Sequence, residues 1–167
     1  MDIQNIYNSI AELSREIVRE CTARSVKIST AESCTGGMIS GAVTSVSGSS
    51  AVIELGVCSY SNRIKHEILH VPAEVLERFT EYSVECAAEM AKGVMELSGA
   101  DYGVSTTGVA GPPGGSAEQK RICLAFSGRT GCRSERFLFA QGSADRELIR
   151  ALAAEKALSM LLCEIKK

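Results

Sequence analysis

Short apolar stretches alternate with amphipathic stretches along nearly the whole chain, and this alternation constrains the fold more than any other feature. In residues 3–20, isoleucine and leucine recur at three- and four-residue steps, the spacing that places apolar side chains on one face of a helix. Glycine, proline, serine and asparagine separate the later stretches, as they do at turns and helix ends. The pattern predicts strands at residues 25–29, 52–60, 102–106, 122–126 and 133–139, and further helices at residues 38–46, 62–68, 73–79, 84–98 and 145–165.

Helices and strands that alternate in this way are typical of α/β proteins. No long linker divides the 167 residues, and a chain of this length suits one domain. We therefore predict a single domain over residues 1–167, folded as a three-layer α/β/α sandwich with a mixed sheet.

Composition excludes several classes of protein. Hydrophobic residues make up 45% of the chain and charged residues 23%, which is typical of a globular protein and argues against disorder. No apolar run approaches the roughly 18 residues of a membrane-spanning helix, and the mixed, acidic N-terminus does not resemble a signal peptide. The net charge of −2, the 5% of aromatic residues and the absence of tryptophan argue against nucleic-acid binding. We expect neither nucleic acid nor a membrane as a partner.

The seven cysteines are odd in number, irregularly spaced and without a CxxC pair, so they indicate neither a zinc site nor a disulfide framework. Such cysteines are typical of a reducing compartment, where they pack as small apolar side chains. Only two histidines, His66 and His70, are available for metal binding or a catalytic triad. The sequence thus predicts a cytoplasmic protein with no metal and no cofactor.

The segment AESCTGG at residues 31–37 places hydroxyl groups between a predicted strand and a glycine-rich helix start. Ser33 could attack a carbonyl group while unpaired amides at the helix start stabilise the oxyanion. Alternatively, Ser33 and Thr35 simply cap the helix. A further alternative is a hydrolase that uses the adjacent thiol of Cys34. The segment matches neither the GxSxG elbow nor a Walker loop.

A second polar segment, YSNRIK at residues 60–65, lies across a predicted strand end and helix start. Tyr60 and Lys65 can therefore reach the same edge of the sheet. Because histidine is scarce, a lysine whose pKa is lowered by burial is the natural general base for a serine, and Tyr60 could relay a proton. The alternative is that Lys65 is solvated and Tyr60 lies at a rim.

A third segment, at residues 106–115, carries four glycines within eight positions directly after a buried strand. Glycines let a backbone approach a ligand closely and expose amides to it, although a rigid surface turn is the alternative. Ligands of open α/β sheets bind outside the carboxyl ends of strands. All three polar segments follow predicted strand ends, so we expect them to meet at one site.

Four segments in this order resemble the CinA C-terminal domain family: AESCTGG at residues 31–37, YSNRIK at 60–65, TGVAGPPGG at 107–115 and GSADRELIR at 142–150. The resemblance covers about residues 5–164. Standalone members, of the PncC type, are nicotinamide-nucleotide amidases. The resemblance implies hydrolysis of the carboxamide of nicotinamide mononucleotide to nicotinate mononucleotide and ammonia, in pyridine nucleotide recycling, by a metal-free homodimer. Full-length CinA proteins carry a further N-terminal pyrophosphatase domain, whose activity we do not transfer to this chain.

Carried over by position, the resemblance makes Ser33 the nucleophile and Lys65 its activator. Tyr60 would assist proton transfer or orient the amide, and Arg146 would stabilise charge near the substrate. The backbone around residues 34–36 would supply the oxyanion donors. The residues that would shape the nucleotide site are Thr35, Gly36, Thr107, Gly108, Gly111, Gly114 and Gly115.

The chain departs from these relatives in two segments. Relatives carry a sequence close to HGAVS before the long helix, whereas residues 79–83 here are FTEYS. After the glycine loop, relatives carry a lysine-proline-valine-glycine stretch, whereas residues 119–122 here are QKRI, so that Ile122 replaces a glycine. Two functions remain open: an active serine-dependent amidase, and a divergent or catalytically silent paralogue that keeps the fold and binds a nucleotide.

Overall fold

A five-stranded mixed sheet forms the centre of the computed structural model, which describes residues 2–110, 121–128, 131–138 and 145–167. The strand order is β2-β1-β3-β4-β5; β1 runs parallel to β2 and β3, while β4 and β5 continue the sheet in antiparallel pairs. The strands are β1 (Ile28–Glu32), β2 (Ile53–Cys58), β3 (Tyr102–Gly108), β4 (Arg121–Gly128) and β5 (Gly131–Leu138). The helices are α1 (Ile3–Arg24), α2 (Met38–Thr44), α3 (Asn62–Glu67), α4 (Ala73–Phe79), α5 (Val84–Ser98) and α6 (Arg146–Ile165), with a 3-10 turn η1 at Ser49–Ala51.

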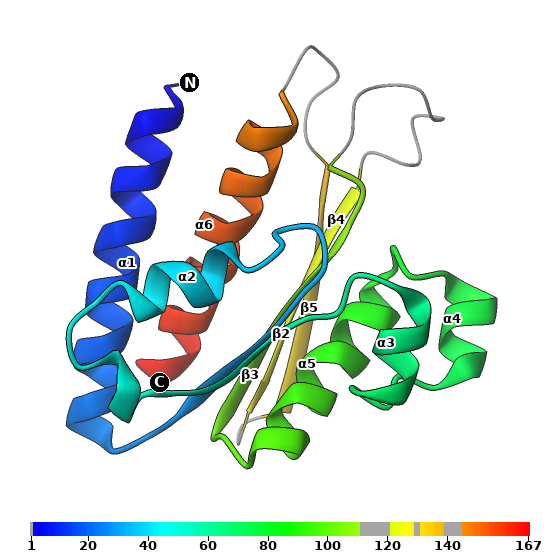
Figure 1. The fold of residues 1–167 in the computed structure, drawn as a ribbon, viewed down its shortest axis with the longest axis horizontal. Coiled ribbons are helices and arrows are strands. Elements are labelled where there is room, and N and C mark those ends of the chain that lie inside the picture. Colours follow the sequence, from blue (N-terminus) through cyan, green and yellow to red (C-terminus); the bar gives the residue numbers. More distant parts are fainter. Residues whose placement is uncertain (1, 111–120, 129–130, 139–144) are drawn as a thin grey trace.

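Helices cover both faces of this sheet (Figure 1). Helices α1, α2 and α6 pack together on one face, and α5 packs against the other, with α3 and α4 on the same side as α5. The main apolar core lies between the sheet and the layer of α1, α2 and α6, and smaller apolar clusters lie under α5. The predicted three-layer α/β/α sandwich with a mixed sheet is confirmed.

Local sequence signals set most of the helix ends. Helix α4 spans the predicted residues, and Ser83 caps α5 by accepting a hydrogen bond from the amide of Cys86. Gly99 ends α5 in the left-handed conformation, with φ of 69°. These helices follow from residues that satisfy the otherwise unpaired backbone groups of a helix end.

All five strands differ from their predicted ranges by one to three residues at one or both ends, and the reasons are clear for β1 and β3. Strand β1 begins at Ile28 because Ser25, with φ of 53°, ends α1 in the left-handed conformation and Lys27 bonds through its amide to Asp101. Strand β3 continues through Thr107 to Gly108, so two residues that were predicted to lie in a loop belong to the sheet. None of the helices in the described part of the chain combines the length and the apolar character that crossing a bilayer requires.

Two glycines let α5 pack closely against its neighbours. A Cβ atom on Gly93 would lie 1.9 Å from the backbone oxygen of Leu69, and one on Gly103 would lie 2.1 Å from that of Ala91. Only glycine fits at contacts this short, because larger residues would force the backbones apart. Helix α5 is therefore fixed against both β3 and the segment that follows α3.

Because β1, β2 and β3 are parallel, their carboxyl ends lie at one edge of the sheet. The three polar segments predicted to form a site follow these ends at Glu32, Cys58 and Gly108. The fold thus brings together segments that are far apart in the sequence, as the predicted meeting of strand ends requires.

Candidate active site

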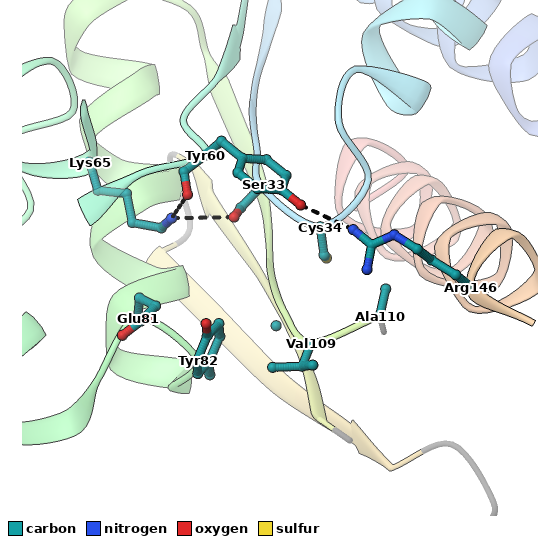
Figure 2. Close-up of a pocket in the computed structure, with 10 residues that line it drawn as sticks. Ser33, Cys34, Tyr60, Lys65, Glu81, Tyr82, Val109, Ala110 and Arg146 are labelled. Atoms are coloured by element: carbon teal, nitrogen blue, oxygen red, sulfur yellow. Dashed lines mark hydrogen bonds between the residues drawn. The ribbon is translucent and has the colours of Figure 1, made fainter. Parts of the chain in front are cut away.

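A cavity of about 200 Å³ opens at this edge of the sheet (Figure 2). Residues from the ends of all three parallel strands, from α3 and from the first turn of α6 contribute to its wall. The lining residues are Ser33, Cys34, Tyr60, Lys65, Glu81, Tyr82, Gly108, Val109, Ala110 and Arg146.

The Lys65 amine lies beside the Ser33 hydroxyl at the base of this site. Lys65 Nζ donates hydrogen bonds to Ser33 Oγ at 3.2 Å and to the backbone oxygens of Ser59 at 2.9 Å and Tyr60 at 3.3 Å. Ser61 caps α3 and so fixes the helix that carries Lys65. Figure 2 shows the Lys65 amine directed at the Ser33 hydroxyl oxygen, with both side chains among those that line the cavity. This is the arrangement of a nucleophile and a base within hydrogen-bond reach.

Burial controls the charge of Lys65, which is only 1% exposed. Loss of solvation lowers the pKa of the Lys65 amine, while the nearby Cys86, Glu81 and Cys34 partly oppose that shift. A lowered pKa increases the fraction of neutral amine, the form that can accept a proton. The alternative in which Lys65 is solvated is therefore wrong.

Tyr60 and Arg146 form the outer part of the site. Arg146 Nη2 donates a hydrogen bond to the Tyr60 hydroxyl at 3.0 Å, and Tyr60 is 64% exposed. Helix α6 carries Arg146 in its first turn, so this contact joins the C-terminal helix to the end of β2 (Figure 2). A guanidinium group at this rim attracts an anionic group of a ligand.

The buried carboxylate of Glu32 holds the start of α2. It accepts hydrogen bonds from the amides of Gly37, Ile39 and Ser40 at 3.0, 3.1 and 2.8 Å. The Thr35 and Ser40 hydroxyls also donate to this carboxylate. Glu32 therefore occupies amides of residues 37, 39 and 40, at the helix start that was predicted to offer free amides, but not those of residues 34–36. The alternative in which Ser33 and Thr35 cap this helix is wrong, because its N-cap is Gly37.

The thiol of Cys34 lies next to the nucleophile candidate but is poorly suited to attack. Burial raises its pKa to about 12, although hydrogen bonds from the Thr106 hydroxyl and from the Cys34 and Thr35 amides oppose the shift. A thiol with such a pKa stays protonated near neutral pH, and the thiolate is the nucleophilic form. The raised pKa of this thiol, together with the hydrogen bond between Lys65 and Ser33, favours Ser33 over Cys34 as the nucleophile.

The structure does not bring every predicted substrate-binding residue to the cavity. Thr35 is buried, where its hydroxyl also hydrogen-bonds with Thr106 Oγ1 at 2.7 Å, and Thr107 is buried with its hydroxyl donated to the Glu81 carbonyl. Gly36 is exposed and does not line the cavity, whereas Gly108 does. The predictions for Gly111, Gly114 and Gly115 lie outside the described residues.

Glu81 and Tyr82 line the cavity although they were not predicted as site residues, whereas Val109 and Ala110 belong to the segment 106–115 that was expected to meet the site. The signal for the first two was present, because Glu81 and Tyr82 fall in the segment that departs from the relatives. The pKa of the Glu81 carboxyl is below its ordinary value. Burial alone would raise this pKa, but hydrogen bonds from its own amide, Tyr82 and Asn62 and the charge of Lys65 stabilise the carboxylate and outweigh burial. Within the described ranges, no three His, Cys, Asp or Glu side chains are placed so as to hold a metal ion.

Comparison with known proteins gives the family. The model of the CinA C-terminal domain matches residues 10–165. The chain belongs to this family. Among relatives, the nicotinamide-nucleotide amidohydrolase PncC of Enterobacter agglomerans is 43% identical over 160 residues, which are 93% of this chain and 95% of that protein.

Longer relatives and solved structures agree with this assignment. A CinA-like protein of Geotalea daltonii is 44% identical over 140 residues, which are 83% of this chain but 33% of that protein, so the chain spans about a third of such longer relatives. The competence/damage inducible protein CihA of Agrobacterium tumefaciens has a TM-score of 0.87 and 39% identity, over 95% of this chain and 96% of that chain. The competence damage-inducible protein A of Klebsiella pneumoniae has a TM-score of 0.87 and 33% identity, over 94% and 97% of the two chains.

Proposed function

We propose that this chain hydrolyses the carboxamide of nicotinamide mononucleotide to nicotinate mononucleotide and ammonia, with Ser33 as the nucleophile. The single observation that carries the proposal is the 3.2 Å hydrogen bond between Ser33 Oγ and the buried Lys65 amine in a cavity at the strand ends. The similarity to an amidohydrolase over nearly the full length of both proteins supplies the substrate.

The first half of the reaction forms an ester on Ser33. The neutral Lys65 amine accepts the proton of the Ser33 hydroxyl as Oγ attacks the carboxamide carbon. The resulting tetrahedral intermediate collapses when the Lys65 ammonium group returns the proton to the amide nitrogen. The carbon–nitrogen bond breaks, ammonia leaves, and the nicotinoyl group stays bound to Ser33.

The second half releases the acid. A water molecule attacks the ester carbon while Lys65 accepts one of its protons, and the carbon–oxygen bond to Ser33 then breaks. Lys65 returns the proton to Ser33 Oγ, and the product leaves as a carboxylate with one proton released to solvent. Lysine thus acts in turn as general base and general acid, which requires the lowered pKa that burial gives it.

Arg146 and Tyr60 orient the substrate in this proposal. The Arg146 guanidinium lies at the outer rim, where it stabilises negative charge of the nucleotide. Its hydrogen bond to Tyr60 holds the tyrosine hydroxyl over the cavity, where Tyr60 orients the amide or assists proton transfer. Backbone amides after Ser33 stabilise the oxyanion.

The test is ammonia release by the purified protein with nicotinamide mononucleotide and a small panel of pyridine nucleotides and amides. We expect release from the mononucleotide, loss of release in Ser33→Ala, and retention in Cys34→Ala. Release that survives in Ser33→Ala and disappears in Cys34→Ala would reverse the assignment of the nucleophile.

One observation favours a divergent substrate as the second candidate. Glu81 and Tyr82, which replace the family's smaller residues, line the cavity, and Ile122 lies opposite the cavity residue Gly108 in the sheet. In this alternative the chain binds a different nucleotide or has lost catalysis. Binding of the mononucleotide without ammonia release, or release from another amide of the panel alone, would favour it.

We also propose that the protein is a cytoplasmic homodimer built from a single domain, as the resemblance implies. Size-exclusion chromatography with light scattering tests the dimer: a mass of twice 17.7 kDa is expected, and the mass of one chain contradicts it.

A further inference from the structure

Arg150 makes a two-pronged contact with the backbone directly after Ser33. Its Nε donates to the carbonyl oxygen of Cys34 at 3.2 Å, and its Nη2 donates to that of Thr35 at 2.7 Å. Gly36, with φ of 61°, allows this approach, because a Cβ atom there would lie 3.3 Å from Arg150 Nη2. Arg150 lies one helical turn after Arg146, so α6 reaches both the rim and the nucleophile loop.

Because each peptide unit is planar, this contact with two carbonyl groups also fixes the orientation of two amides. In a trans peptide the N–H points opposite to the C=O of the same plane. The carbonyl of Cys34 shares its peptide with the amide of Thr35, and the carbonyl of Thr35 shares its peptide with the amide of Gly36. A cation that holds both carbonyls therefore fixes both amides and strengthens them as donors by polarising the peptides.

The Thr35 amide lies beside the side chain of Cys34, a residue that lines the cavity. The Thr35 amide, together with the Cys34 amide, is placed to stabilise negative charge on Cys34 Sγ, and Cys34 lines the cavity beside Ser33. A negative charge that develops on an oxygen bound near Ser33 would meet the same donors. Glu32 accepts from the amides of Gly37, Ile39 and Ser40, so it does not engage the amides of the two peptides held by Arg150.

We propose that Arg150 is a positioning residue that orients and polarises the Thr35 and Gly36 amides, and that these amides are the oxyanion donors for attack by Ser33. The inference rests on the proposed function and adds a role for a residue that touches neither the cavity nor the substrate. The fork of an arginine suits two adjacent carbonyls, whereas a lysine amine would act as a single point charge.

The experiment compares Arg150→Ala and Arg150→Lys with Lys156→Ala, a control that removes an exposed charge from the same helix. Two rates are measured on the full chain: turnover of nicotinamide mononucleotide, and the reaction of Ser33 with a fluorophosphonate. In the second reaction Ser33 Oγ bonds to phosphorus, fluoride leaves and Lys65 takes the proton, so it requires an oxyanion site but no natural substrate.

We expect Arg150→Ala to lower both rates by about 10- to 100-fold, the effect of misplacing or weakening an oxyanion donor, while KM stays nearly constant. Arg150→Lys should lie between this variant and the wild type. Millimolar methylguanidinium should restore part of both rates in Arg150→Ala and change neither rate in the control.

Each outcome separates the inference from the proposed function. The inference is overturned if the Arg150 variants react with the fluorophosphonate and turn over substrate as fast as Lys156→Ala does. A raised KM with unchanged kcat and an unchanged rate of labelling also overturns it. A wild type that is labelled but releases no ammonia contradicts the proposed substrate, and slower labelling of the variants still supports the role of Arg150. If Arg150→Ala does not fold, Arg150→Lys decides: wild-type labelling overturns the role, and slower labelling in a folded protein supports it.

Discussion

Replacing Lys65 by methionine removes the amine but keeps most of the volume of the buried side chain. A general base contributes at least about a hundredfold to turnover, which is about 2.7 kcal/mol of barrier at 1.36 kcal/mol for each factor of ten. The substitution removes hydrogen bonds to Ser33, Ser59 and Tyr60, each of which contributes about 1 kcal/mol to stability. It also removes the desolvation penalty of burying a charged amine, and this gain offsets part of the loss. We therefore expect turnover to fall a hundredfold or more while the free energy of unfolding changes by less than about 2 kcal/mol.

The assay is steady-state ammonia release from nicotinamide mononucleotide, together with urea unfolding of the same preparations. Lys156→Met is the matched control, because Lys156 is an exposed lysine on α6 whose amine lies over the Phe137 ring. This control should keep wild-type turnover. If Lys65→Met keeps turnover within a few-fold of the wild type while it remains folded, Lys65 is not the base and the mechanism must be abandoned.

Three other predictions concern pH, the loop anchor and packing. Burial lowers the pKa of Lys65 from its ordinary value of 10.5, and the fraction of neutral amine increases as pH rises through the lowered value. The value of kcat should therefore rise with pH and level off at a lower pH than an exposed lysine would give; a kcat that falls as pH rises would contradict this. Glu32→Gln should lower the free energy of unfolding by about 1–3 kcal/mol in urea, because the amide nitrogen replaces one carboxylate oxygen and cannot accept the backbone N–H bonds that this oxygen receives; unchanged stability would argue against the anchor. Gly93→Ala should destabilise by about 1–3 kcal/mol or more, since its Cβ would overlap the carbonyl of Leu69, whereas Gly41→Ala, with open space in α2, should be neutral or stabilise by up to about 1 kcal/mol; equal effects would refute the packing argument.

Much of the fold follows from local patterns in the sequence. Apolar periodicity placed the helices, and capping residues such as Ser83 and Gly99 marked their ends because they satisfy backbone groups locally. The mixed sheet between helical layers and the meeting of the polar segments at strand ends followed from the α/β pattern, whereas the order of the strands did not. Strand β3 was predicted to end too early, because Thr107 and Gly108 have no apolar character although Thr107 is buried.

The candidate site, too, was predictable only in part. Ser33, Tyr60 and Lys65 line one cavity, as expected from polar segments that follow strand ends, and Arg146, which only the resemblance indicated, lines the same cavity. The buried anchor Glu32 could not be recognised, since nothing local distinguishes a buried carboxylate from an exposed one.

Contacts across long sequence distances were equally invisible. The donation of the Thr107 hydroxyl to the Glu81 carbonyl and the reach of Arg150 to the loop after Ser33 depend on how α5 and α6 pack. Local periodicity carries no information on such contacts, which come from tertiary packing.

Rapid quenching of the wild-type enzyme during turnover, followed by peptide mass spectrometry, tests the central claim most directly. The account predicts the nicotinoyl nucleotide esterified to Ser33 and no modification of Cys34. An acyl group found on Cys34, or full ammonia release by Ser33→Ala, would contradict it.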